Sequence, residues 1–134
     1  MSIHADDLLE LVIAPTLTAL GTNTPTAAQW LLASARRSDF NPLERRGDGL
    51  GLYLITPRQH RQAWDGYLAF RPDLASRVRG LASQRQFLEN PDRELQTNLA
   101  YTTAIAWVIH LQSEESLPDA TGARNREEAL CAGA

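Results

Sequence analysis

The sequence has 134 residues, of which 43% are hydrophobic and 22% are charged, so it has room for one globular domain with one core and not for two domains of ordinary size. All 13 basic residues are arginine, and the formal net charge is −3. This balance argues against a nucleic-acid-binding protein, which usually carries net positive charge. No apolar run reaches the ~18 residues that a membrane-spanning helix needs.

The first helix is predicted over residues 5–20, where leucines recur at spacings near three and four. Pro15 should kink or divide it, because proline lacks a backbone N–H. Thr24-Pro25 is a typical N-cap followed by a first helical residue, and it opens a second helix to about Arg37. Residues 38–50 are then expected to form a loop, rich in Asn, Pro, Gly and charge.

Prolines also open the later helices. Thr56-Pro57 repeats the cap signature, and Pro72 and Pro91 each begin another apolar pattern. The last of these helices is apolar on most of its sides, which is typical of a helix that runs through the middle of a domain. The expected helices are 56–70, 72–82 and 91–111.

These patterns predict an all-α fold, mainly helical, with at most one short extended segment near residues 50–55. We expect an N-terminal helical arm at 1–23 and a helical domain at 24–112. A polar C-terminal tail follows at 113–134, with one short helix near 123–131. No signal peptide is expected, because the first residues lack a basic stretch.

Charge is unevenly distributed along the chain. Residues 1–35 contain three acids and no bases, residues 36–93 contain eleven arginines and seven acids (+4), and residues 94–134 contain two arginines and six acids (−4). This pattern fits head-to-tail contacts between copies. A solvated surface with local salt bridges is the preferred interpretation, and contacts between copies stay open as the alternative.

A set of short motifs lies in an order that points to a known fold. Gly51-Leu52-Tyr53-Leu54 is followed by Ile55-Thr56-Pro57 at the step into a helix, and Asn98 precedes the small-residue run at 101–104. Over residues 24–112 the chain resembles the lysozyme-like fold of the soluble lytic transglycosylases. The run at 65–78 is similar to short virion-associated phage proteins of this type.

The resemblance implies a glycan cleft, but two of its polar positions differ. Where the family has a catalytic Glu before a Ser, this chain has Arg37 before Ser38, and Leu54 replaces the Gln of the glycan-lining motif. Cleavage of a glycan needs a carboxylic acid to protonate the leaving oxygen. A guanidinium has a pKa above ~12 and cannot supply that proton. We therefore expect no catalysis.

Glu44 and Asp48, in the loop before the motif, are the fallback acids for a displaced catalytic site. Paired carboxyl groups at the spacing a glycosidase needs would support them. Because Arg45 and Arg46 adjoin them, salt-bridged surface groups are the preferred interpretation.

Other chemistries have little support in the sequence. His4, His60 and His110 show no metal-ligand spacing, so neither a metal nor a cofactor is expected. His60 is expected on a helix surface and His110 partly buried. Trp30, Trp64 and Trp107 have apolar neighbours at helical spacing and are expected to pack in the core, although they are also able to stack on sugars. Cys131 is the one cysteine.

Two function classes remain. The preferred hypothesis is a catalytically inactive, lysozyme-like structural protein of a phage virion, located at the head–tail junction, in the tail or on the capsid. It would be made in the bacterial cytoplasm and would contact other phage structural proteins and copies of itself in a ring or shell. The alternatives are a peptidoglycan-cleaving enzyme with a displaced acid and a non-catalytic glycan-binding module. No nucleic acid or membrane partner is expected. A solvated surface is the preferred interpretation of the arginines along the middle of the chain. The alternative is a basic contact patch for acidic segments of another chain, such as residues 114–128 of a neighbour, made by Arg36, Arg37, Arg45, Arg46, Arg58 and Arg61.

Overall fold

A computed structural model of the chain describes residues 2–116, except the side chains of 84–86 and 115–116, and it confirms a mainly α-helical fold. None of the helices within that range combines the length and the apolarity that crossing a bilayer requires. The short helical turns are π-helical at Leu9–Ile13 and 3-10 at Leu68–Phe70 and Pro91–Arg93. The α-helices are α1 Ala5–Leu8, α2 Ala14–Leu20, α3 Pro25–Arg36, α4 Pro57–Gly66, α5 Pro72–Leu81, α6 Gln84–Glu89, α7 Glu94–Thr97 and α8 Leu99–Ser116.

The first predicted helix exists, and Pro15 alters it as expected. Between α1 and α2 the backbone widens into a π-helical turn, in which the Ala14 N–H donates to the carbonyl of Leu9, five residues back. A wider turn beside a proline is a common adjustment, because the ring removes one N–H and crowds the preceding turn. Gly21, at φ 80°, ends α2 in the left-handed conformation.

The N-terminal segment is not a separate arm. Leu8, Ile13 and Leu17 are fully buried in the same hydrophobic cluster as the later helices. Residues 1–23 were predicted as an N-terminal helical arm, and the buried face of this segment packs against the later helices. The reason is physical, since its apolar stripe needs a partner and α8 supplies one.

The Thr-Pro signatures start helices where the sequence predicts them. Thr24 Oγ1 accepts from the Ala27 N–H at 3.1 Å to cap α3. Thr56 and Gln59 form a reciprocal capping box at the start of α4, with distances of 3.1 Å and 3.0 Å. The helix expected to reach residue 70 ends instead at Gly66 and gives way to the 3-10 turn.

The predicted extended segment lies slightly earlier and is a hairpin. Strands β1 (Arg45–Arg46) and β2 (Gly49–Leu50) pair antiparallel, with Arg45 opposite Leu50. Residues 51–54 then form a turn, closed by a single bridge between Leu50 and Ile55. Within this turn both Gly51 (φ 78°) and Leu54 (φ 54°) adopt positive φ.

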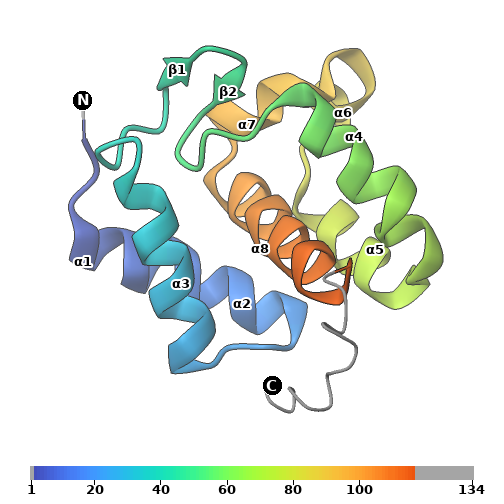
Figure 1. Ribbon diagram of the computed structural model, residues 1–134, viewed down its shortest axis with the longest axis horizontal. Coiled ribbons are helices and arrows are strands. Elements are labelled where there is room, and N and C mark those ends of the chain that lie inside the picture. The colour runs from blue at the N-terminus through green and yellow to red at the C-terminus, as the bar shows by residue number, and fades with distance from the viewer. Residues whose placement is uncertain (1, 117–134) are drawn as a thin grey trace.

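The last predicted helix is divided at Asn98. The Asn98 backbone leaves the helical region (φ −124°, ψ 99°), and its Oδ1 accepts from the Tyr101 N–H at 3.0 Å, which caps the start of α8. From there α8 runs through the middle of the molecule with the other helices around it (Figure 1). Residues 101–108 are all buried, which confirms the central position that the sequence predicts.

The structure also differs from the sequence prediction after α5 and at the end of α8. The short helix α6 was not predicted. The first residues of the predicted polar tail are helical, because α8 continues to Ser116. The short helix expected near 123–131 lies outside the described residues.

The turn at 51–54 is packed so closely that one glycine is required. A Cβ on Gly51 would collide with the backbone carbonyl oxygen of Leu95, and the residue also has positive φ. Gly51→Ala should lower the free energy of unfolding by about 3 kcal/mol, because backbone atoms must move to admit the methyl group. Urea denaturation measures this loss.

Gly80→Ala is the matched control. Gly80 lies in α5 with nothing within 4 Å of an added Cβ. Here alanine should stabilise the fold by about 0.5–1 kcal/mol, since it restricts the unfolded chain and favours helix. A Gly51→Ala variant as stable as the wild type would contradict the close packing of the turn against α7.

Candidate functional site

A groove runs along the exposed flank of α8, between α3 and α4. It consists of adjoining hollows that share Ile109, one of about 840 Å³ on the α4 side and one of about 430 Å³ on the α3 side. The α3 side is lined by Trp30, Ala33, Ser34, Arg37, His110 and Ser113. The α4 side is lined by Arg58, Gln59, Arg61, Gln62, Asp65, Gly66, Gln112 and Ser113.

The α4 wall follows from helical spacing. Arg58, Arg61, Gln62 and Asp65 recur at three and four residues, so they share one face of the helix. The opposite face carries His60 and Ala63, which are buried. Asp65 is the one acidic residue that lines either hollow within the described part of the chain.

Arg37 lies at the point where the resemblance would place a catalytic acid, and it is engaged in holding the fold. Its Nη2 donates to the Tyr53 carbonyl at 2.9 Å, and its own carbonyl accepts from Arg46 Nη1 at 2.9 Å. Next to it, the buried Ser38 Oγ donates to the Leu52 carbonyl at 2.7 Å. The end of α3 is thereby fixed to the 51–54 turn.

The structure does not bring the two fallback acids into the groove. Glu44 Oε2 pairs with Arg46 Nη2 at 3.1 Å, and its Oε1 accepts from Asn41 Nδ2 at 3.0 Å. Asp48 is exposed in the hairpin turn between β1 and β2. Neither residue lines the hollows on either side of α8.

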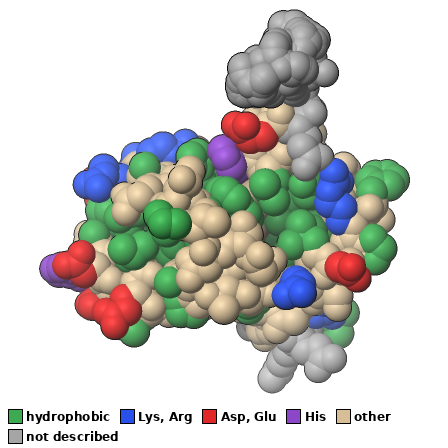
Figure 2. Space-filling view, turned by 90° about the horizontal axis from the view of Figure 1, so that it is seen from below, with side chains coloured by type: hydrophobic (Ala, Val, Ile, Leu, Met, Phe, Trp, Pro, Cys, Tyr) green, Lys and Arg blue, Asp and Glu red, His purple; other side chains and the backbone are tan. Residues whose placement is uncertain are grey.

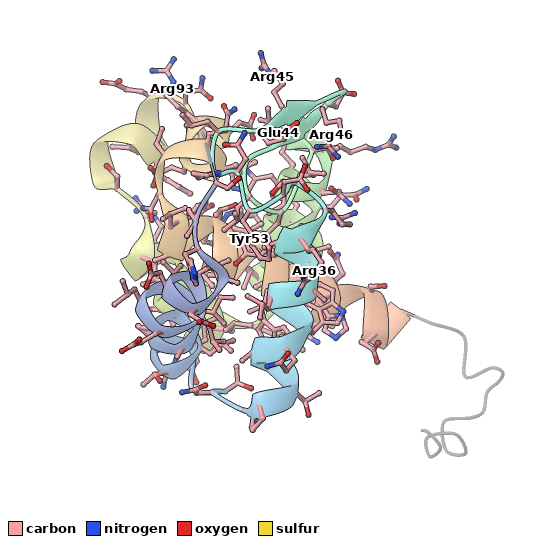
Figure 3. The ribbon with its side chains drawn as sticks, turned by 90° about the vertical axis from the view of Figure 1, so that its left-hand side faces the viewer. Arg36, Glu44, Arg45, Arg46, Tyr53 and Arg93 are labelled. Atoms are coloured by element: carbon pink, nitrogen blue, oxygen red, sulfur yellow. The ribbon has the colours of Figure 1, made fainter. Side chains whose placement is uncertain are left out.

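The six arginines of the predicted contact patch are exposed but fall into two groups. Around the end of α3, Arg36 lies with its guanidinium 5.4 Å from the Phe40 ring centre, and Arg45 and Arg46 extend from the hairpin in different directions (Figure 3). Arg58 and Arg61 lie on α4 and line the groove. Arg37 lies between the two groups and lines the α3 side.

A buried polar network was missed from the sequence. His60 was expected on a helix surface, but it is only 2% exposed. Its Nδ1 lies 2.9 Å from Asp92 Oδ1 and its Nε2 lies 2.6 Å from the Tyr101 hydroxyl, which also accepts from Trp64 Nε1 at 2.8 Å. The helical spacing of His60, Ala63 and Tyr67 is the signal that would have placed His60 on the buried face.

The donors and acceptors of this network fit one proton arrangement. Because Trp64 can only donate, the Tyr101 oxygen accepts from it and gives its own proton to His60 Nε2, which leaves the Nδ1 proton for Asp92. Burial lowers the pKa of His60, an effect opposed by the hydrogen bond to Asp92, and burial raises the pKa of Tyr101. His60 is therefore neutral.

The order carboxylate, imidazole and hydroxyl also occurs in nucleophilic catalysis. Here the Tyr101 side chain is fully buried, so no substrate reaches its oxygen. The network links α4, the 91–93 turn and α8 through buried hydrogen bonds. A similar link joins Tyr53 and Thr103, whose hydroxyls lie 2.8 Å apart.

Aromatic rings line the α3 side of the groove. The His110 ring centre lies 4.1 Å from that of Trp30 and 5.0 Å from that of Trp107. His110 is half-buried, as expected, and Trp107 is buried. Trp30 and Trp64 pack against the core but remain half-buried.

Among the described residues, no group of three or more His, Cys, Asp or Glu side chains could hold a metal ion. Comparison with protein-family models, with curated proteins and with solved structures finds no significant match to this chain. The lysozyme-like resemblance therefore stays a prediction.

Tyr101→Phe tests the network directly. It leaves His60 Nε2 and Trp64 Nε1 without their partner in a buried site, so the free energy of unfolding should fall by about 2–3 kcal/mol. Tyr53→Phe is the matched control, because that hydroxyl has one side-chain partner, and a loss of about 1 kcal/mol is expected. Equal losses in the two variants would contradict the shared role of the Tyr101 oxygen.

Stability should also depend on pH through His60. Its folded pKa lies below the ordinary value of 6.5, so the unfolded state binds the proton first as pH falls. The stabilisation is complete above pH 6.5 and is lost progressively below it, by at most about 1.4 kcal/mol per pH unit. Besides Asp92, the charges acting on His60 are Arg61 and Glu94.

Urea titrations between about pH 8 and about pH 5 measure this slope. His60→Gln should flatten it. A slope that persists in the His60→Gln variant would assign the pH dependence to another group.

Proposed function

We propose that this chain is a catalytically inactive domain of lysozyme-like type that serves as a structural subunit of a phage particle. One observation carries the proposal. At the position where the resemblance calls for a proton donor, the Arg37 guanidinium donates to the Tyr53 carbonyl and helps hold the end of α3. A permanent cation in that role cannot protonate a glycosidic oxygen.

The rest of the groove supports the same conclusion. Glycoside hydrolysis ordinarily uses two carboxyl groups facing each other across the scissile bond. The described lining offers Asp65 alone, and it is exposed on α4 beside two arginines. Glu44 lies outside the groove, where it pairs with Arg46. The described lining of the groove therefore offers Asp65 no second carboxyl group.

The assignment to a phage particle follows from the resemblance of residues 24–112 and of the run at 65–78. A fold can outlast its chemistry, because stability depends on the core while catalysis depends on a few cleft side chains. In this chain the central part of α8 is buried in the hydrophobic core. At the two polar positions that the resemblance assigns to the glycan cleft, the chain has Arg37 and Leu54.

A glycan-binding module is the second candidate. Trp30 lines the groove while remaining half-buried, and aromatic faces stack on sugars. The amide groups of Gln59, Gln62 and Gln112 line the neighbouring hollow. A pull-down with insoluble peptidoglycan tests this, with Trp30→Ala as the variant that should abolish binding.

Purified cell walls test the absence of catalysis. The wild type should leave their turbidity unchanged over hours, and Glu44→Gln and Asp48→Asn should behave identically, because neither acid lines the groove. In parallel, the chain should be present at a fixed copy number in purified phage particles. Clearing by the wild type that either substitution abolishes would refute the proposal.

A further inference from the structure

We propose that the groove on the α4 side of α8 receives the acidic C-terminal segment, residues 114–134, of a second copy of this chain. The inference rests on the proposed function, since it names the partner through which subunits would assemble. Two properties of the groove and one of the helix that borders it support this contact.

The first property is unused positive charge. Arg58 and Arg61 are exposed and line the groove. No hydrogen bond or ion pair is found for either guanidinium among the described residues. Arg37 and Arg46, by contrast, bind backbone carbonyls or Glu44. Within the described part of the chain, the two arginines of α4 are therefore free to meet an outside anion.

The partner segment has the complementary charge. Residues 114–134 contain five acids and two arginines, a net charge of −3. Glu114 and Glu115 lie in the last turn of α8, and the other three acids follow it. The acids of the N-terminal segment belong to folded helical turns rather than to a free segment. Asp6 and Asp7 belong to α1, which lies across the molecule from α4 (Figure 1), and red side chains mark that edge in Figure 2.

The second property is a lining that suits an extended peptide. Ile109 gives the floor an apolar contact, and Gln62 presents both a donor and an acceptor. Gln59 offers its amide N–H groups, since its Oε1 accepts from the Thr56 N–H, and Gln112 offers its Oε1, since its Nε2 donates to the Gln62 carbonyl. A peptide backbone loses hydrogen bonds to water when it enters a groove, and such amides replace them. A volume of about 840 Å³ leaves room for several residues.

The direction of α8 favours a neighbour over the same molecule. Its last turns extend beyond α3 and away from the body (Figure 3), and Glu114 is exposed there. The segment that follows starts from a helix end directed outward, while the groove lies back along the side of that helix. A contact of one copy's end with the next copy's groove is heterologous, so repetition closes a ring or extends a filament.

A charge-exchange experiment tests this contact. The full chain should self-associate in sedimentation-velocity runs, with a mass that rises with concentration at about 50 mM salt and falls at about 500 mM. The groove variant, Arg58→Glu with Arg61→Glu, and the tail variant, Glu127→Arg with Glu128→Arg, should each weaken association at least tenfold. An equimolar mixture of the two should regain it, because every groove then meets a tail of opposite charge.

Arg45→Glu with Arg93→Glu is the matched control. Both residues are exposed and neither lines the groove, so this variant should associate like the wild type. A wild type that stays monomeric at every concentration would overturn the proposal, and so would a groove variant that associates normally. A monomer that binds DNA through Arg58 and Arg61 would assign the face to nucleic acid instead.

These outcomes are distinguishable from failure of the proposed function. Cell-wall cleavage would refute the inactive domain while leaving the contact between copies intact. Loss of the contact, with no cleavage and a fixed copy number in particles, would leave the structural role and require another docking surface.

Discussion

The position of α8 at the centre of the molecule constrains everything around it. Polar groups on a helix buried on nearly all sides are costly unless a partner meets them, and on α8 the Thr102 hydroxyl is buried with no hydrogen-bond partner among the described residues. Two tyrosine hydroxyls meet this demand, since Tyr101 binds His60 and Trp64 of α4, and Thr103 binds Tyr53 of the 51–54 turn. These links fix α4 and the turn relative to α8, and the groove lies between the elements that they hold.

Arg37 makes structural contacts at the position where the resemblance implies a reactive group. An ionised carboxylate in its place would form no hydrogen bond with the Tyr53 carbonyl, since both groups only accept. The guanidinium instead donates to that carbonyl and lies beside Ser38, whose hydroxyl fixes the adjacent carbonyl of Leu52. Arg37 thus contributes to stability at a position where the resemblance implies a catalytic acid. This difference is the basis of the proposed structural role.

Local signals in the sequence predicted much of the fold. Thr24-Pro25 and Thr56-Pro57 gave correct helix starts because capping depends on neighbouring residues alone. The break at Asn98 and the burial of His60 were not predicted, since each depends on groups far along the chain: Asn98 Nδ2 binds the Leu81 carbonyl, and His60 binds Asp92 and Tyr101. For the site, the sequence predicted that Glu44 would be salt-bridged. It could not show that Arg37 and Arg46 bind groups of the fold while the described part of the chain gives Arg58 and Arg61 no such partner.

The π-helical turn at Leu9–Ile13 solves a spacing problem. Leu8 and Ile13 are both fully buried although five residues separate them, a spacing that an ordinary α-helix would place on different faces. The wider turn takes up the additional residue and returns Leu17 and Leu20 to the same stripe. The helical segment over residues 5–20 therefore contains one residue more than a regular α-helix with this buried face needs. Deletion of one residue from the wide turn would restore regular α-helical winding. Insertion of another would rotate the buried leucines on one side of the turn towards water.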